Sequence, residues 1–200
     1  TAMIERLDDS VGQIIATLKR LNLTQNTLVV FSSDNGGYLN YAGGFENISD
    51  MGPLRGEKGT IYEGGHRVPA IISWPGRISP AICHETAMTF DLLPTFAALA
   101  NASANREGSL DGADLRPVLF EGATIAKRNL FWRMGSQRAI RSGFWKLCLR
   151  GSKSIELYNL ADDLGETRNL ASARPKLVSE LAESIAAWEA EVDQSAKAFQ

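Results

Sequence analysis

Residues 27–37 read Thr-Leu-Val-Val-Phe-Ser-Ser-Asp-Asn-Gly-Gly, a β-branched and aromatic run that ends in a cluster of turn residues. Such a run is typical of a strand that is buried on both faces of a sheet. Before it, apolar residues from Ile4 to Leu18 recur at three- and four-residue spacing, which predicts an amphipathic surface helix. A helix followed by a buried strand predicts an α/β layer with a parallel sheet.

The α/β pattern continues to about residue 100. The stretch Ala70-Ile-Ile-Ser-Trp74 predicts a second buried strand, and residues 90–100 predict a helix that accommodates Pro94 in its first turn. Between the two strands, residues 34–65 show little periodicity. An irregular segment of this length inside a compact domain is usually functional or disordered.

Beyond residue 126 the pattern changes to short strands. Four strand-like runs are separated by glycine, serine and lysine, and they lie at 130–134, 138–140, 144–149 and 156–158. They predict an antiparallel sheet of three or four strands. Apolar residues from Leu177 to Val192, opened by Pro175, predict a C-terminal helix that covers one face of this sheet. We therefore expect two parts, an α/β part over 1–125 and a small α+β domain over 126–200.

The composition excludes several classes of protein. The 21 basic and 23 acidic residues give a net charge of −2, and neither sign is gathered into long blocks, which argues against binding to nucleic acid or to an anionic membrane. No apolar run approaches the roughly 20 residues of a membrane span. The chain begins at Thr1, directly in a helical pattern and without a visible signal peptide, and we expect further residues upstream.

The first candidate site is Asp34-Asn35, directly after the first predicted strand. In open α/β sheets, ligands bind outside the carboxyl ends of the strands. A carboxylate beside a carboxamide offers two hard oxygen donors, which suit Ca²⁺ or Mg²⁺. The alternative is an ordinary turn, because Asp, Asn and Gly dominate turns. The four residues Asp34-Asn35-Gly36-Gly37 by themselves favour that alternative.

The second candidate site lies in the glycine-rich segment 53–69, which contains the cations Arg55, Lys58 and Arg67. Cations among glycines that permit close backbone approach are what an oxyanion pocket requires. The alternative is a solvated loop in which these cations pair with Glu57 and Glu63, each exposed pair contributing about 0–1 kcal/mol. The residue chemistry alone leaves both interpretations open.

Several motifs together resemble the type I sulfatases, in order and in spacing. In the first part they are residues 6–10 (RLDDS), 33–36 (SDNG), 54–59 (LRGEKG), 62–65 (YEGG), 67–69 (RVP), 89–95 (TFDLLPT) and 111–115 (DGADL). In the second part they are residues 145–147 (WKL), 156–160 (ELYNL) and 166–170 (ETRNL). The resemblance covers nearly the whole chain and implies the C-terminal part of an alkaline phosphatase-like fold, followed by the small domain.

The resemblance implies roles for individual residues. Asp34 and Asn35 would be ligands of an active-site Ca²⁺, with Mg²⁺ as the other option, and Lys58 would contact the sulfate. His66 and Arg55 are further candidates for substrate contact. Sulfatases of this type use a formylglycine made from a C-x-P/A-x-R motif, which neither cysteine of this chain matches. The nucleophile is therefore expected upstream of this chain, together with the other metal ligands.

The implied function is hydrolysis of an organic sulfate ester, aryl or carbohydrate, by a longer protein. The chain by itself is expected to be inactive, because loss of a covalent catalytic residue costs many orders of magnitude in rate. Two other functions stay open: a phosphodiesterase or phosphonate monoester hydrolase of the same superfamily, and a non-catalytic pseudosulfatase that binds ligand. Periplasmic, secreted and lysosomal locations are all compatible with the family.

Two further expectations concern the surroundings of the site. Substrate choice is expected to depend on the loop from Tyr38 to Met51, and aryl, steroid and glycan sulfates all stay open. A sheet cut after some of its strands exposes an edge. We therefore also expect self-association of the chain through that edge.

Overall fold

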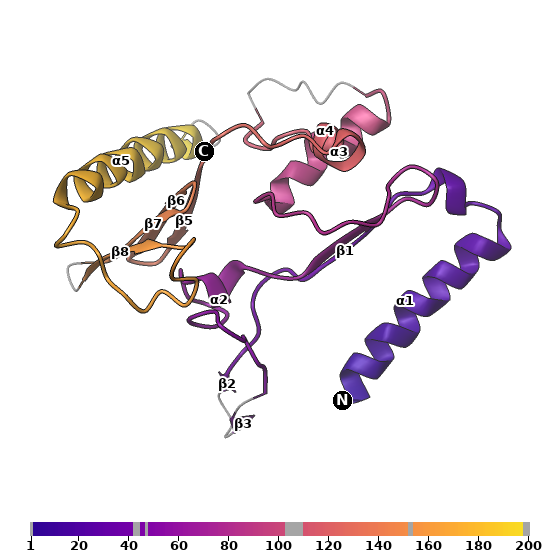
Figure 1. Cartoon of the computed structure of the whole chain (residues 1–200), viewed down its shortest axis with the longest axis horizontal. Coiled ribbons are helices and arrows are strands. Elements are labelled where there is room, and N and C mark those ends of the chain that lie inside the picture. The colour runs from indigo at the N-terminus through magenta and orange to yellow at the C-terminus, as the bar shows by residue number, and fades with distance from the viewer. Residues whose placement is uncertain (1, 42–44, 47, 103–109, 152–153, 198–200) are drawn as a thin grey trace. The chain divides into compact units, whose positions relative to one another are not determined.

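A computed structural model describes residues 2–41, 45–46, 48–102, 110–151 and 154–197 (Figure 1). The predicted specificity loop 38–51 therefore lies partly outside the described residues. The chain forms two compact units, one of residues 1–31 with 71–126 and one of residues 32–70 with 127–200. The division predicted between residues 125 and 126 stays a prediction.

The first unit is mainly helical. Its helices are α1 (Ala2–Arg20), the 3₁₀ helix η1 (Thr24–Asn26), the 3₁₀ helix η2 (Thr89–Asp91), α3 (Leu92–Leu99) and α4 (Arg116–Glu121). The helix predicted over 90–100 is confirmed, with Pro94 in the first turn of α3. Helix α4 was not predicted; it has a proline in its first turn and ends at Gly122, whose φ of 66° suits a glycine.

Asp91 and Thr95 tie α3 to the segment before α4. The carboxylate of Asp91 accepts hydrogen bonds from Met88 N at 2.7 Å and from Ala113 N at 2.8 Å. The hydroxyl of Thr95 donates to Asp91 O at 2.7 Å and accepts from Leu115 N at 2.9 Å. Both side chains are buried, so residues 89–95 and 111–115 are fixed to each other by polar contacts inside the unit.

Two strands join at the boundary of the units, where β1 (Val29–Ser32) pairs with β4 (Ala70–Ser73). The prediction that these strands are buried on both faces is wrong for this chain. Phe31 is 37% exposed and Ile71 is 61% exposed. The physical reason is that β1 and β4 form a sheet of only two strands among the described residues, which leaves apolar side chains uncovered.

The second unit is built on a four-stranded antiparallel sheet, which confirms the predicted small sheet. Its strands, in spatial order, are β5 (Asn129–Met134), β6 (Gln137–Ser142), β7 (Trp145–Arg150) and β8 (Ile155–Asn159). The predicted C-terminal helix is confirmed as α5 (Pro175–Lys197). The same unit contains the short pair β2 (Asn40–Tyr41) and β3 (Phe45–Glu46), and the one-turn helix α2 (Glu63–His66).

Both faces of the four-stranded sheet are covered. On one face, Ile140, Leu147 and Leu157 pack with Leu181 and Ile185 of α5, and Figure 1 shows α5 lying across this sheet. The other face packs against the segment before α2, and its cluster consists of Ile61, Tyr62, Ala139, Cys148, Tyr158 and Leu160. Successive side chains of a strand point to opposite faces, so each strand contributes to both clusters.

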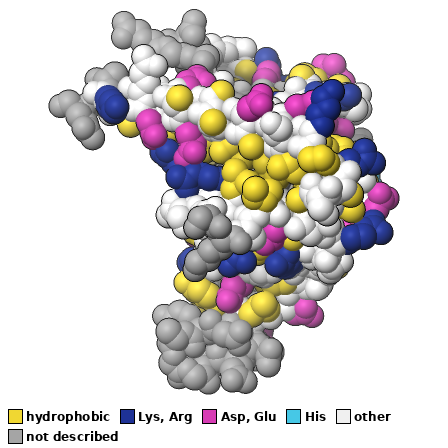
Figure 2. Space-filling model, turned by 90° about the vertical axis from the view of Figure 1, so that its left-hand side faces the viewer, with side chains coloured by type: hydrophobic (Ala, Val, Ile, Leu, Met, Phe, Trp, Pro, Cys, Tyr) yellow, Lys and Arg dark blue, Asp and Glu magenta, His cyan; other side chains and the backbone are white. Residues whose placement is uncertain are grey.

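The surface charge is mixed. On the face shown in Figure 2, Lys and Arg side chains are interspersed with Asp and Glu, and a group of hydrophobic side chains lies among them. Neither sign of charge dominates that face, in keeping with the net charge of −2. None of the helices in the described part of the chain is both long and apolar enough to cross a membrane.

Candidate functional site

Asp34 and Asn35 follow the last residue of β1 by two and three positions. The Asp34 side chain is exposed and Asn35 is half-buried. No other described residue makes a hydrogen bond or an ion pair with the Asp34 carboxylate or the Asn35 carboxamide; Ser33 Oγ donates to the backbone oxygen of Asn35 at 2.8 Å. Both side chains are therefore available to an external ligand, and the predicted metal-binding role stays untested.

Lys58 is fixed beside this segment through its backbone. Its N–H donates to Gly37 O at 2.9 Å, and the neighbouring Glu57 carboxylate accepts from Leu39 N at 2.6 Å. The Lys58 side chain is exposed, and its ammonium lies 5.3 Å from the centre of the Tyr38 ring. The structure thus brings a solvent-facing cation and two oxygen donors, 23 residues apart in sequence, onto adjoining turns.

Close backbone packing holds the two turns together. Gly36 N donates to Gly65 O at 3.0 Å. A Cβ atom on Gly36 would lie 1.8 Å from Gly64 O, and one on Gly64 would lie 2.4 Å from Gly56 O. Real Cβ atoms do not approach a carbonyl oxygen so closely, so these positions require glycine because of space, whatever their φ angles.

The predicted metal site stays a prediction. Among the described residues, no group of three or more His, Cys, Asp or Glu side chains is arranged to hold a metal ion. Ca²⁺ takes six to eight oxygen ligands, and Asp34 with Asn35 supplies two side-chain donors of the appropriate hard type. The donor set fits the cation in chemistry, and the remaining ligands have to come from elsewhere.

Arg55 connects the lysine-bearing turn to the sheet. Its Nη1 donates to Tyr158 Oη at 2.7 Å and to Glu166 O at 2.9 Å, and lies 3.4 Å from Glu156 Oε2. The guanidinium also stacks over the Tyr62 ring, 3.9 Å from its centre. These contacts engage Nη1 of Arg55 inside the protein. The predicted role of Arg55 in substrate contact stays untested.

His66 lies at the end of α2 against the sheet. Its ring stacks on Trp132 with the centroids 4.3 Å apart, and its Nε2 lies 3.3 Å from Ile61 O and 3.2 Å from Lys146 Nζ. Burial, and then repulsion by Lys146, lower the pKa of His66 to about 4. The ring is neutral at pH 7 and packs in the unit; its predicted substrate contact stays untested.

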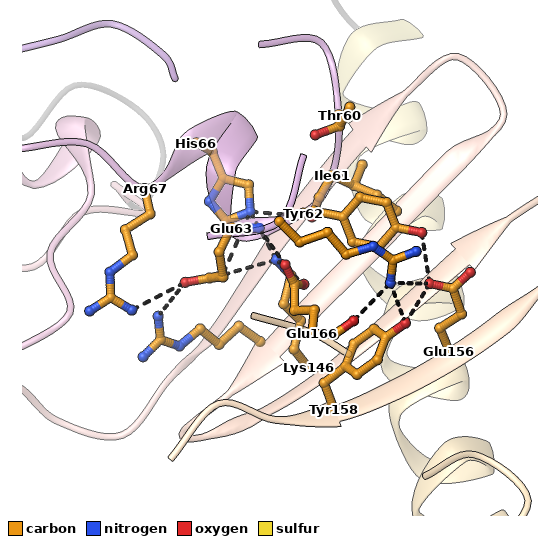
Figure 3. Close-up of polar contacts among 12 residues, drawn as sticks. Thr60, Ile61, Tyr62, Glu63, His66, Arg67, Lys146, Glu156, Tyr158 and Glu166 are labelled. Atoms are coloured by element: carbon orange, nitrogen blue, oxygen red, sulfur yellow. Dashed lines mark hydrogen bonds and ion pairs between the residues drawn. The ribbon is translucent and has the colours of Figure 1, made fainter. Parts of the chain in front are cut away.

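Sequence reasoning missed the most buried polar group of the unit, a cluster formed by Glu63, Lys146 and Glu166 (Figure 3). All three side chains are at most 1% exposed, and Lys146 Nζ lies 2.9 Å from both Glu63 Oε1 and Glu166 Oε1. Glu166 Oε2 accepts a hydrogen bond from Glu63 N at 2.7 Å. Arg67 and Arg141 approach the other oxygen of Glu63 at 3.4 and 3.5 Å.

The two carboxylates of this cluster differ electrostatically. Burial alone would raise the pKa of Glu63, but attraction and a hydrogen bond from Lys146, with His66 and Arg141 nearby, lower it below its usual value. Burial raises the pKa of Glu166, and attraction to Lys146 offsets this only in part. Glu63 is therefore the firmly ionised partner, because several cations surround it.

A hollow of about 630 Å³ lies in the first unit. Its lining includes Trp74, Arg77, Asp114, Arg116 and Phe120. None of Asp34, Asn35, Arg55, Lys58 and His66 lines it. Because the chemistry of the candidate site lies on exposed turns of the second unit, the size of this hollow does not identify the site.

Comparison with known proteins identifies the family. Residues 1–102 match the family model described as sulfatase. That stretch contains Asp34, Asn35 and Lys58, the three residues whose arrangement fits binding of a cation and an anion. The chain belongs to the sulfatase family.

Relatives and a solved structure agree with this assignment. The chain is 35% identical over 202 residues to a sulfatase of Formosa agariphila and 35% identical over 207 residues to human arylsulfatase A, with 87% and 88% of the chain covered. It spans 35% and 40% of the length of these relatives. A solved structure from glycosaminoglycan metabolism of Bacteroides thetaiotaomicron superposes with a TM-score of 0.79 at 26% identity, over 92% of this chain and 43% of that one. The alkaline phosphatase-like fold predicted for the first part is confirmed by these neighbours.

Gly36→Ala tests the packing of the two turns. The added Cβ would lie 1.8 Å from Gly64 O, and we expect a loss of about 1–3 kcal/mol in unfolding free energy, typical of overpacking. Urea unfolding of the wild type and the variant measures this difference in unfolding free energy. Gly12→Ala is the matched control, because Gly12 is exposed in α1 with open space around it, and it is expected to gain up to about 1 kcal/mol. A Gly36→Ala protein as stable as the wild type would contradict the packing described.

The pKa of His66 predicts a pH dependence of stability. The unfolded chain binds a proton at His66 below pH of about 6.5, whereas the folded protein binds it only near pH 4. The stability contribution is therefore fully present above pH of about 6.5 and is lost as the pH falls towards 4, with a slope of up to about 1.4 kcal/mol per pH unit.

Unfolding free energies measured between pH 4.5 and 8, a range set by these pKa values, test this dependence. His66→Gln is expected to flatten the slope, while His84→Gln, which changes the exposed second histidine, is expected to keep it. Equal slopes for the wild type and His66→Gln would refute the buried neutral histidine.

Proposed function

We propose that this chain is part of a sulfuric ester hydrolase, in which Lys58 binds the sulfate group and Asp34 and Asn35 hold a Ca²⁺ ion. One observation carries the proposal: the hydrogen bond from Lys58 N to Gly37 O, which holds the turn of the exposed Lys58 against the turn that contains Asp34 and Asn35. The family membership and the names of the relatives support it.

The residues of this chain suit one part of the reaction. Negative charge develops on the sulfate oxygens and on the leaving oxygen when the S–O bond breaks, and a fixed cation stabilises that charge. Lys58 supplies such a cation from a turn whose backbone is held by hydrogen bonds. A bound Ca²⁺ would supply further positive charge at the same group. The formylglycine nucleophile is proposed to lie in residues upstream of this chain, so the chain alone does not turn over substrate.

The substrate proposed is an organic sulfate ester, aryl or carbohydrate. Arylsulfatases and sugar sulfatases both occur among the relatives, so the family alone leaves the organic group open. The rival function, phosphodiester or phosphonate hydrolysis, has less support, because the relatives named here are sulfatases. A pseudosulfatase that only binds is disfavoured by the retention of Asp34, Asn35 and Lys58 in one arrangement.

Lys58→Met in the enzyme that carries this chain tests the proposal. Removal of one oxyanion-stabilising donor typically lowers kcat by about 10²- to 10³-fold, and we expect a loss of that size with 4-nitrophenyl sulfate. Lys176→Met is the matched control, because Lys176 is exposed on α5, and it is expected to keep wild-type rates.

Three outcomes would count against the proposal. Equal rates for Lys58→Met and the wild type would remove Lys58 from the site. Faster hydrolysis of a phosphonate monoester than of any sulfate ester would favour the rival enzyme. Tight binding of sulfated sugars without turnover by the whole protein would favour the binding module.

We also propose self-association of the isolated chain through β1 and β4. The support is the exposure of Phe31 and Ile71 on a sheet that has two strands among the described residues. An uncovered strand edge is a template for pairing with another chain. Sedimentation of the isolated chain is expected to reveal dimers or larger species at micromolar concentration. A strictly monomeric profile would argue against this edge as a contact surface.

A further inference from the structure

Lys146 occupies a position that its strand pattern does not explain. Strand β7 alternates Trp145, Leu147 and Leu149 with Lys146, Cys148 and Arg150, and the first three pack towards α5. The side chain of Lys146 points to the opposite face, where it is 0% exposed. An ammonium is buried completely only when it is paired. The segment that covers Lys146 must therefore supply acceptors for its charge.

The cover is the segment that carries Lys58. Lys146 holds the side chain of Glu63, the first residue of α2, while Glu166 accepts a hydrogen bond from the backbone of the same Glu63. Figure 3 shows Glu63, Lys146 and Glu166 close together, with Tyr158 and Glu156 nearby. Arg55 contacts both Tyr158 and Glu156. The beginning of α2 is thus attached through one residue to strand β7 and to the turn after β8.

A continuous set of short backbone contacts leads from Glu63 to Lys58. Gly64 N donates to Arg55 O at 2.7 Å, and Thr60 N and Thr60 Oγ1 both donate to Glu57 O. These bonds close the turn that contains Lys58. From that turn, Lys58 N reaches Gly37 O, and Gly65 O accepts from Gly36 N.

The glycines along this path leave little freedom for adjustment. A Cβ atom on Gly65 would lie 2.2 Å from Thr60 O, and one on Gly64 would lie 2.6 Å from Arg55 O. Backbones packed this closely move together, because interiors at this density do not deform continuously. A shift of Glu63 therefore shifts the turn of Lys58 and the turn of Asp34.

Glu166 shows that the fold accepts local strain to complete the cluster. Its φ of 52° lies in the left-handed region, which is unfavourable for a residue with a side chain. In this conformation its carbonyl oxygen accepts from Arg55 and its carboxylate accepts from Glu63 N. One strained residue thus holds both attachments of the 55–66 segment, and an observed outlier of this kind points to a functional requirement.

We propose that Lys146, through Glu63 and Glu166, is a positioning residue for substrate binding, which sets Lys58 at the sulfate and holds its turn against the turn of Asp34 and Asn35. This inference rests on the proposed sulfatase function. Lys146 does not touch the substrate; it acts through the path from Glu63 to Lys58. A role limited to filling the interior would predict that any well-folded replacement is fully active.

The central experiment separates positioning from folding in the enzyme that carries this chain. Lys146→Met alone removes the cation that Glu63 and Glu166 share and is expected to lower the melting temperature. The double variant Lys146→Met with Glu166→Gln removes one negative charge as well, leaves Glu63 with Arg67 and Arg141, and is expected to recover most of that loss. Its kcat/KM for 4-nitrophenyl sulfate is nevertheless expected to stay about 10- to 100-fold below wild type, because a misplacement of about 1 Å has effects of this size.

Coupling to Lys58 identifies the path of the effect. If Lys146 acts through Lys58, adding Lys58→Met to the double variant lowers kcat/KM by much less than Lys58→Met lowers it in the wild type, because residues that act as a unit are not additive. Inhibition by inorganic sulfate provides a second measurement, and its inhibition constant is expected to rise in the double variant.

Two further variants keep the test decisive. Leu157→Val lowers stability in the cluster under α5, on the face of the sheet opposite to Lys146. It is expected to lower the melting temperature without changing kcat/KM at temperatures below it. Glu166→Gln alone keeps the shape of the side chain and an acceptor for Glu63 N, so it is expected to fold. If the double variant does not fold, this single variant tests whether the cluster positions Lys58. A several-fold fall in its kcat/KM supports the positioning role.

The outcomes distinguish this inference from the proposed function. Wild-type kcat/KM in the folded double variant, or in Glu166→Gln if the double variant does not fold, would overturn the inference while leaving the sulfatase function intact. Full additivity with Lys58→Met would also overturn it. A wild-type enzyme that hydrolyses no sulfate ester would refute the proposed function, and the inference with it.

Discussion

The second unit depends on one buried ammonium shared by two carboxylates. Lys146 comes from β7, Glu63 from the start of α2, 83 residues earlier, and Glu166 from the turn after β8. Removing one partner of a buried ion pair typically costs about 3–5 kcal/mol, because the other charge stays buried without compensation. The cluster therefore determines which irregular segment can cover this face of the sheet, and in which register.

This constraint explains how a segment with little regular structure presents a defined site. Between β1 and β4 the described secondary structure is two short strand pieces and one helical turn, yet the 55–66 segment is attached at Glu63 and again at Arg55. Lys58 lies between the two attachments, with its backbone held and its side chain exposed. A charged side chain on a fixed backbone can exchange water for an anion without a large rearrangement, which is how pre-organised sites gain affinity.

Much of this arrangement was predictable from local pattern. The four-stranded sheet, α3 and α5 follow from periodicities that their own residues carry. The roles predicted for Asp34, Asn35 and Lys58 follow from the resemblance of their motifs to the type I sulfatases, because the residue chemistry alone left other interpretations open. Lys146 was not predictable, because a lysine that alternates with Trp145 and Leu147 is typical of a solvent-facing position. Its burial depends on a segment some 80 residues away, and sequence periodicity holds no information on such a partner. The exposure of Phe31 and Ile71 was missed for a related reason. A hydrophobic run predicts that a strand is buried, but whether other residues cover it depends on segments elsewhere in the chain.

The account rests on the claim that the Lys146 cluster holds the turn of Lys58 against the turn of Gly36, and native-state hydrogen exchange tests it most directly. The amides of Lys58 and Gly36, which donate across the two turns, can be compared with amides of the β6–β7 ladder in the wild type and in the variant that combines Lys146→Met with Glu166→Gln. The account predicts that Lys58 and Gly36 lose protection in the variant while the ladder stays protected, because local opening no longer requires unfolding of the sheet. Unchanged protection at Lys58 and Gly36 in the folded variant would contradict it.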